Sequence, residues 1–129
     1  MDMEKFLLES GAVKFGDFTL ASGRKSSYYV DIKKAATHPG FLKESARRMA
    51  LAMPDCQRVA GVELGAVPLA VALSMETSIP YIIVRKKPKG YGTSSLIEGP
   101  LEAGERVLFV EDVTTTGGSL IKGVAAVRK

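Results

Sequence analysis

Two adjacent carboxylates, Glu111 and Asp112, lie in an apolar run at residues 107–113, and a stretch of small residues follows them up to Ser119. Threonines and glycines at positions 114–118 let backbone N–H groups approach an anion, and a helix starting near Ser119 would add its partial positive charge. Carboxylates suit sugar hydroxyls or a hydrated divalent cation. This pattern predicts a site for a phosphorylated sugar; the alternative is an ordinary strand-to-helix turn with surface acids.

A second group with chemical potential is the basic cluster at residues 85–89, in which four of five side chains are cationic. Its charge equals the formal net charge of the whole chain, +4. A nucleic-acid surface would spread its lysines and arginines along an element, whereas a focused cluster suits a small polyanion such as pyrophosphate. The alternative is a solvated basic loop.

Other kinds of site find little support in the residue types. The chain has one cysteine, Cys56, and one histidine, His38, so it offers no structural zinc site, disulfide framework or cysteine–histidine nucleophile. Any metal must therefore be held by oxygen. No P-loop motif occurs, and the glycines at 90 and 92 lack the third glycine of a dinucleotide fingerprint.

The composition favours one globular domain. The 129 residues are 46% hydrophobic and 25% charged, and no run of 18 apolar residues is present. The N-terminal ten residues are too acidic, and their apolar run is too short, for a secretory signal. We therefore expect a cytoplasmic protein.

The elements that must position these groups can be read from hydrophobic periodicity. A short helix is expected from Met3 to Gly11, then strands at residues 18–20 and 28–32 around a turn at 22–25. A second helix should begin at Pro39 and end before Pro54.

From there the pattern alternates between strand and helix. Residues 59–64, 81–84 and 107–113 are predicted strands, residues 66–77 a helix, residues 88–104 a functional loop, and another helix begins near Ser119. Such alternation predicts neighbouring parallel strands in an α/β fold, with Glu111 and Asp112 at the carboxyl edge of the sheet.

Three segments together resemble one known family. Residues 110–119 look like the phosphoribosyl-pyrophosphate (PRPP) loop of type I phosphoribosyltransferases. Residues 18–31 are similar to the N-terminal hairpin of orotate phosphoribosyltransferases, and residues 85–92 resemble their catalytic loop. The resemblance implies a parallel sheet flanked by helices, with residues 1–38 forming an N-terminal helix and hood hairpin and residues 39–129 the core of a single domain.

The resemblance also implies a role for each site residue. Glu111 and Asp112 would be catalytic and bind the ribose hydroxyls, with Mg²⁺ carried by PRPP nearby; Lys89 would be catalytic on a loop that closes over the neighbouring subunit of a homodimer. The remaining implied contacts are to PRPP from Arg85, Lys86, Lys89, Tyr91, Val113, Thr114, Thr115, Thr116, Gly117, Gly118 and Ser119, to pyrophosphate from Glu63, Leu64 and Gly65, and to orotate from Thr115, Tyr29 and Val30.

The chain departs from the family pattern at three places. Tyr91 replaces the usual histidine, and Ala21 replaces a frequent lysine. The family's orotate-binding arginine falls beyond Lys129, as do further strands of the sheet. We therefore expect the natural protein to be longer, with the sheet incomplete at the C-terminus of this chain; completion of the fold by a partner is the alternative.

The expected reaction is transfer of ribose 5-phosphate from PRPP to orotate, giving orotidine 5′-monophosphate and pyrophosphate with Mg²⁺, in pyrimidine biosynthesis. No nucleic-acid or membrane partner is expected. Two alternatives stay open: a phosphoribosyltransferase for a purine or another pyrimidine base, and a non-catalytic PRPP-binding regulator that binds nucleic acid.

Overall fold

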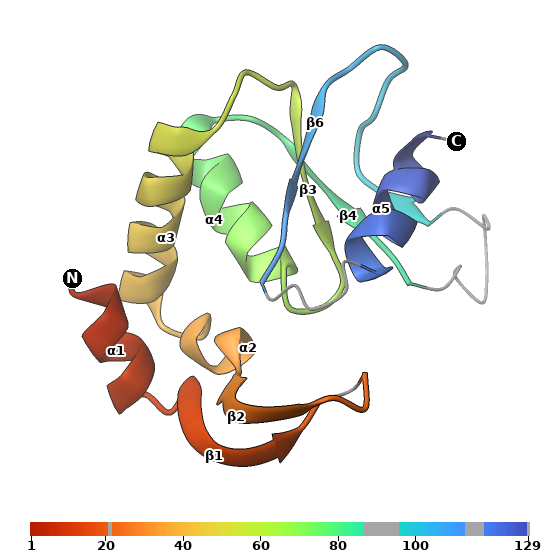
Figure 1. Ribbon diagram of the computed structural model, residues 1–129. Coiled ribbons are helices and arrows are strands. Elements are labelled where there is room, and N and C mark those ends of the chain that lie inside the picture. The colour runs from red at the N-terminus through yellow and green to blue at the C-terminus, as the bar shows by residue number, and fades with distance from the viewer. Residues whose placement is uncertain (21, 87–95, 113–117, 129) are drawn as a thin grey trace.

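The computed structural model describes residues 1–20, 22–86, 96–112 and 118–128. This part of the chain forms five helices and six strands, arranged as in Figure 1. The helices are α1 (Met3–Glu9), α2 (Ile32–Ala35), α3 (Pro39–Ala52), α4 (Val67–Thr77) and α5 (Gly118–Arg128). The strands are β1 (Val13–Thr19), β2 (Lys25–Val30), β3 (Arg58–Val62), β4 (Tyr81–Val84), β5 (Ile97–Glu98) and β6 (Val107–Val110).

The N-terminal segment forms an antiparallel hairpin of β1 and β2. Both strands begin earlier than predicted, because residues 13–15 pair with residues 28–30, and Lys25 and Ser26 pair with Thr19 and Phe18. Ile32, predicted to end a strand, instead opens α2. The hairpin and α2 lie across one end of the main sheet (Figure 1).

The main sheet has four strands in the order β5-β4-β3-β6. β3 pairs in parallel with β4 on one side and with β6 on the other, which confirms the predicted parallel arrangement. The sheet is nevertheless mixed, because β5 adds to β4 in the antiparallel direction. The predicted loop at residues 88–104 is therefore wrong at Ile97–Glu98, where the chain forms a strand.

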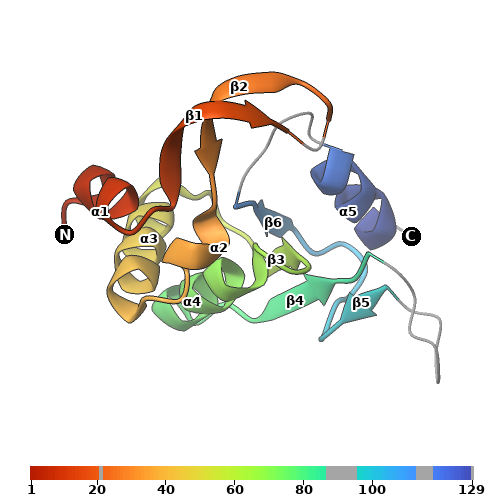
Figure 2. The ribbon, with the colours of Figure 1, turned by 90° about the horizontal axis from the view of Figure 1, so that it is seen from below.

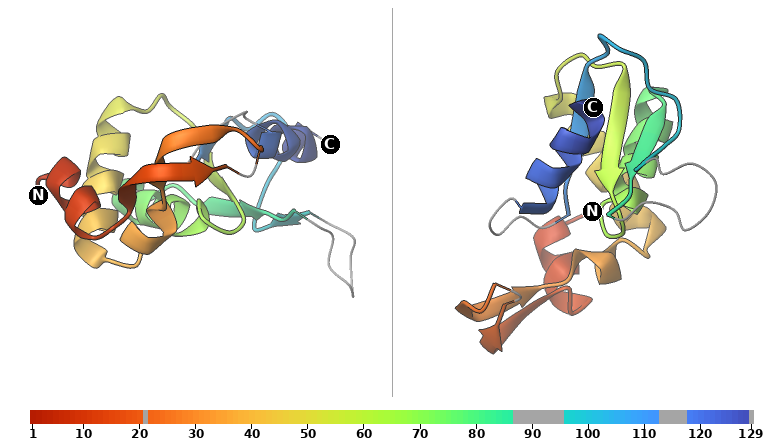
Figure 3. Two further views of the ribbon diagram at one scale, coloured as in Figure 1. Left: turned by 60° about the horizontal axis from the view of Figure 1, so that its bottom comes forward. Right: turned by 90° about the vertical axis from the view of Figure 1, so that its right-hand side faces the viewer.

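Helices cover both faces of this sheet, as expected for an α/β fold. On one face α3 and α4 pack against alternate strand residues, including Val59 and Val110, through buried Phe41 and Leu73. On the other face the neighbouring residues Ala60, Val62, Ile82 and Val84 form a second cluster, to which Ala126 and Val127 of α5 contribute. Figure 3 shows α5 on the side of the sheet opposite to α4.

Local signals explain where the longer helices begin and end. α3 has proline in its first turn and ends at Ala52, two residues before Pro54, as predicted. α4 also has proline in its first turn and ends at Thr77, and the φ of 60° at the next residue, Ser78, is left-handed. None of the helices in the described part of the chain has the length and apolar character needed to cross a membrane.

Candidate functional site

The carboxylate pair lies at the carboxyl end of β6, as the sequence predicts. β6 ends at Val110, so Glu111 and Asp112 follow the strand directly and are half-buried. Because β3, β4 and β6 are parallel, their carboxyl ends share one edge of the sheet. Figure 2 views the molecule from this end and shows the hairpin passing to one side of the sheet, with α2 beside α3 and α4.

The turn after β3 meets Asp112. A Cβ atom added to Gly65 would overlap the Asp112 carboxylate, with Asp112 Cγ only 2.8 Å away. The structure thus brings together two groups that the sequence places in one site, the 63–65 turn and the carboxylate pair. The peptide bond between Glu63 and Leu64 in this turn is cis.

The surroundings of Glu111 alter its ionisation. Burial raises the pKa of Glu111 above its usual value, and Asp112 adds to this through a side-chain hydrogen bond and its negative charge. The Asp112 amide N–H, which donates to Glu111 Oε1 at 3.2 Å, and the positive charge of Lys86 act in the opposite direction. A bound cation or hydroxyl donor would relieve this unfavourable concentration of negative charge.

The start of the basic cluster is fixed to the same turn. The Lys86 amide N–H donates to Glu63 Oε1 at 2.7 Å, and the Glu63 amide donates to the Val84 carbonyl at 2.9 Å. Glu63 therefore joins the turn after β3 to the residues that follow β4.

Arg85 is held by the neighbouring chain. Its amide donates to the Leu96 carbonyl at 2.7 Å, and its guanidinium lies 3.6 Å from the Glu98 carboxylate. Within the described residues, Arg85 Nε is buried without a hydrogen-bond partner. The sequence does not single out Glu98, because the strand that carries it is too short to give a periodic signal.

The hairpin residues of the predicted site differ in exposure. Tyr29 is exposed and packs its ring against Phe18 at a centroid distance of 5.7 Å, whereas Val30 is half-buried. Several predicted site residues lie outside the described part of the chain. These are Lys89, Tyr91, Val113, Thr114, Thr115, Thr116 and Gly117. Gly118 and Ser119 open α5, so the helix begins beside the predicted phosphate loop.

The carboxylate oxygens of the site suit a cation whose other ligands come from the substrate and from water. Among the described residues no group of three or more metal-ligating side chains occurs. Glu111 and Asp112 supply carboxylate oxygens, the atoms that Mg²⁺ prefers, and Mg²⁺ commonly takes one or two protein carboxylates together with substrate phosphates. The residues present therefore fit Mg²⁺ bound with a phosphorylated substrate.

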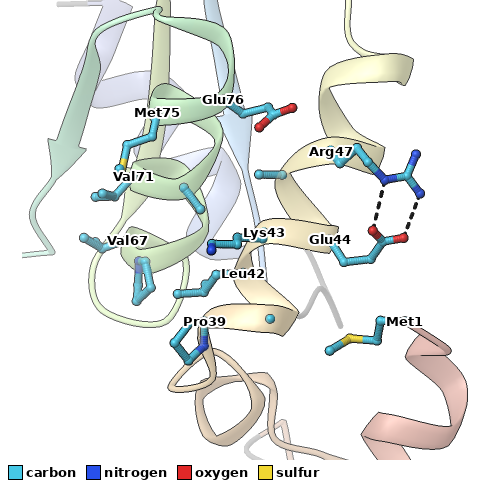
Figure 4. A pocket seen from close by; sticks show the side chains of 14 residues that line it. Met1, Pro39, Leu42, Lys43, Glu44, Arg47, Val67, Val71, Met75 and Glu76 are labelled. Atoms are coloured by element: carbon cyan, nitrogen blue, oxygen red, sulfur yellow. Dashed lines mark hydrogen bonds and ion pairs between the residues drawn. The ribbon is translucent and has the colours of Figure 1, made fainter.

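A separate cavity of about 990 Å³ lies between α3 and α4 (Figure 4). The described residues that line it include Leu42, Val67, Val71 and Met75, and none belongs to the predicted site. Arg47 and Glu44 form an ion pair of 2.7 Å at its edge. Hydrogen bonding to Arg47 lowers the pKa of Glu44 to about 2.

Comparison with known proteins gives one consistent result. The phosphoribosyl transferase domain family matches residues 54–129. The orotate phosphoribosyltransferase of Methanocaldococcus jannaschii is 54% identical over 124 residues, covering 95% of this chain and 70% of that protein. Across eight such curated relatives, this chain spans between 64% and 73% of their length.

Solved structures agree with the sequence relatives. Orotate phosphoribosyltransferase from Aeropyrum pernix matches with a TM-score of 0.81 at 35% identity, covering 98% of this chain and 73% of that one. The Mycobacterium tuberculosis H37Rv orotate phosphoribosyltransferase in complex with PRPP matches with a TM-score of 0.71 at 36% identity, covering 97% of this chain and 72% of that one.

Proposed function

The chain belongs to the orotate phosphoribosyltransferase family, and from this membership we propose that it transfers the ribose 5-phosphate group of PRPP to orotate. The products are orotidine 5′-monophosphate and pyrophosphate, in the biosynthesis of pyrimidine nucleotides. The observation that carries the proposal is the contact of the Gly65 turn with Asp112, because it joins a carboxylate pair and a basic segment at one edge of the sheet.

Each group has a separate task in the proposed reaction. Glu111 and Asp112 accept hydrogen bonds from the ribose hydroxyls, while residues 114–119 wrap the 5-phosphate. Arg85, Lys86 and Lys89 neutralise the pyrophosphate, with Tyr91 as a further hydrogen-bond donor in place of the family's histidine. Mg²⁺, when bound with PRPP near the carboxylates, would neutralise part of the diphosphate charge.

Catalysis depends on stabilising charge. Departure of pyrophosphate builds positive charge on the anomeric carbon and negative charge on the leaving group. Fixed cations next to the leaving oxygens stabilise that separation, and a site closed to water strengthens the effect. We assign Lys89 this role and assign no covalent step to it.

The base would be held between the hood and the core. Tyr29 and Val30 of β2, together with Thr115, are the proposed orotate contacts. The support is the position of the hairpin at the end of the sheet that carries the carboxylates (Figure 2). We also propose that residues 1–38 and 39–129 act as hood and core of one domain, and that the protein is cytoplasmic.

We propose that the protein is a homodimer. The cavity between α3 and α4 marks the surface that a second copy would cover. Apolar side chains of α4 form one wall, among them Met75, which is 81% exposed. Lys43 and Arg47 come from α3 and Glu76 from α4 (Figure 4), so the surface carries both signs of charge. Two copies related by a two-fold axis can then pair opposite charges around an apolar centre.

A product assay tests the proposed reaction. The chain is incubated with PRPP and Mg²⁺ and with orotate, uracil or hypoxanthine in parallel, and nucleotide and pyrophosphate are measured. Product formed with orotate but not with uracil or hypoxanthine supports the proposal. Product formed with one of the other bases would identify a different phosphoribosyltransferase. PRPP binding without product, accompanied by nucleic-acid binding, would instead indicate a regulator.

A further inference from the structure

Lys33 lies at the junction between the hood and the core. It belongs to α2, the short helix that follows the hairpin, and α2 lies beside α3 and α4 at the end of the molecule where β3 and β6 end (Figure 2). Lys33 belongs to none of the motifs described above. Its side chain is exposed, and no salt bridge of Lys33 occurs within the described residues.

The Lys33 stem occupies space that the missing side chain of Gly65 leaves open. Lys33 Cγ lies 3.1 Å from the position that a Gly65 Cβ would take, and the Asp112 carboxylate borders the same position. Lys33, the 63–65 turn after β3 and Asp112 therefore meet at one point. The ammonium is three bonds beyond Cγ, so it can reach a ligand held between the turn and the carboxylates.

The adjacent lysine points elsewhere. Lys34 Nζ lies 3.3 Å from the position of a Cβ on Gly11, in the turn between α1 and β1. Two neighbouring lysines of one short helix thus differ in direction, and only Lys33 contacts the predicted site. This difference supplies a matched control.

The charge balance of the site favours a cation at the position of Lys33. The site already holds two carboxylates, and a diphosphate would add further negative charge beside them. One of the two described cations of the basic cluster, Arg85, is paired with Glu98. A cation that approaches from the hood would offset this excess negative charge.

We propose that Lys33 binds the diphosphate part of the substrate, so that the base of the hood contributes directly to the pyrophosphate subsite. The inference rests on the proposed function, because it identifies a further binding residue for that reaction. It also predicts that binding of the diphosphate links the hood to the core through one side chain.

The test compares Lys33→Met with Lys34→Met in the otherwise intact chain. Methionine keeps much of the apolar stem that packs at Gly65 and removes the charge. Lys33→Met should weaken binding of inorganic pyrophosphate and raise the KM for PRPP by about tenfold, the size expected for one charge-assisted hydrogen bond. The kcat and the affinity for ribose 5-phosphate should change less than threefold, whereas Lys34→Met should change none of these values appreciably.

Two further measurements separate a binding role from a structural one. Lys33→Arg should restore most of the pyrophosphate affinity, and the salt dependence of pyrophosphate binding should be shallower in Lys33→Met than in the unmodified chain. Equal affinities in Lys33→Met and Lys34→Met would overturn the inference. If the unmodified chain forms no product from PRPP and orotate, the proposed function fails instead, and pyrophosphate titration still reports on Lys33.

Discussion

At the scale of single residues, the close approach of Gly65 to Asp112 determines the geometry of the site. Gly65 lacks the atom that would collide with the Asp112 carboxylate, and this allows the turn after β3 to lie directly beside the residues after β6. The contact connects segments far apart in the sequence. A small change at Gly65 should therefore act on ligand binding more than on folding.

We expect Gly65→Ala to weaken PRPP binding by about tenfold while changing the free energy of unfolding by no more than about 1 kcal/mol. The new methyl group forces the Asp112 side chain to rotate, and a rotated carboxylate loses its alignment with the ribose hydroxyls. Calorimetric titration and thermal melting measure the two effects. In an Asp112→Ala background the same substitution should cost less affinity than in the unmodified chain; an undiminished loss there would show that the contact with Asp112 is not the cause.

Glu111 gives a prediction for pH. Its pKa is raised in the folded protein, so the folded state holds the proton more tightly than the unfolded chain does. The contribution of Glu111 to the free energy of unfolding is therefore fully present below the ordinary glutamate pKa of 4.5. It is lost as pH rises through the raised pKa.

Glu111→Gln removes this titration. The variant should therefore melt at a higher temperature than the unmodified chain at pH 7, and the difference should shrink as pH falls toward 4.5. Melting curves of both proteins over this range provide the measurement. A difference that stays constant with pH would contradict the assigned direction of the pKa shift.

At the scale of elements, Glu63 joins β3 to the segment after β4. Its carboxylate accepts the Lys86 amide N–H, and the backbone of the two strands continues the pairing through Val84. The hydrogen bond positions the start of the basic cluster, yet the negative charge of Glu63 works against a bound pyrophosphate. These two effects can be separated by substitution.

Glu63→Gln should bind pyrophosphate at least as tightly as the unmodified chain, because it keeps an oxygen acceptor and removes the charge. Glu63→Ala should bind several-fold more weakly than Glu63→Gln, since it also loses a hydrogen bond of about 1 kcal/mol. Pyrophosphate titration of the two variants makes the comparison. Equal affinities would mean that the hydrogen bond to Lys86 has no part in positioning the cluster.

The elements also show what the sequence could predict. Continuous apolar runs located β3, β4 and β6, and prolines located the ends of α3, because these signals are local. β5 and α2 were missed, since two and four residues are too few to show a period and tertiary contacts decide their conformation. Likewise, residue types indicated Asp112 and the family resemblance indicated Gly65 as site residues, but only the packing of distant segments brings them into contact.

At the scale of the whole molecule, the exposed wall of α4 predicts the dimer surface. Met75→Glu should shift the protein toward monomer, because it places a charge within the proposed apolar contact. Leu51→Glu is the control: Leu51 is 77% exposed on α3 and does not line the cavity. Sedimentation velocity distinguishes the two. Equal dimer fractions in both variants would place the interface elsewhere.

A mixing experiment tests whether the two subunits share a site. Lys89→Ala should lower turnover by about 100-fold, the loss expected for one fixed electrostatic group. If Lys89 acts in the partner's site, mixing this variant with Asp112→Asn should recover part of the activity, because one site of each mixed dimer then has both residues intact. Absence of recovery, with mixed dimers shown to form, would place Lys89 in its own subunit's site.

The central position of β3 also sets an order of folding. Val59 pairs with Tyr81 and with Leu108, so the first pairing closes a much shorter stretch of chain than the second. Because longer closures cost more chain entropy, β3 should pair with β4 before it pairs with β6. The Gly65 turn and the carboxylates therefore come together only in the late pairing, and pulsed hydrogen exchange during refolding should protect the amides shared by β3 and β4 first.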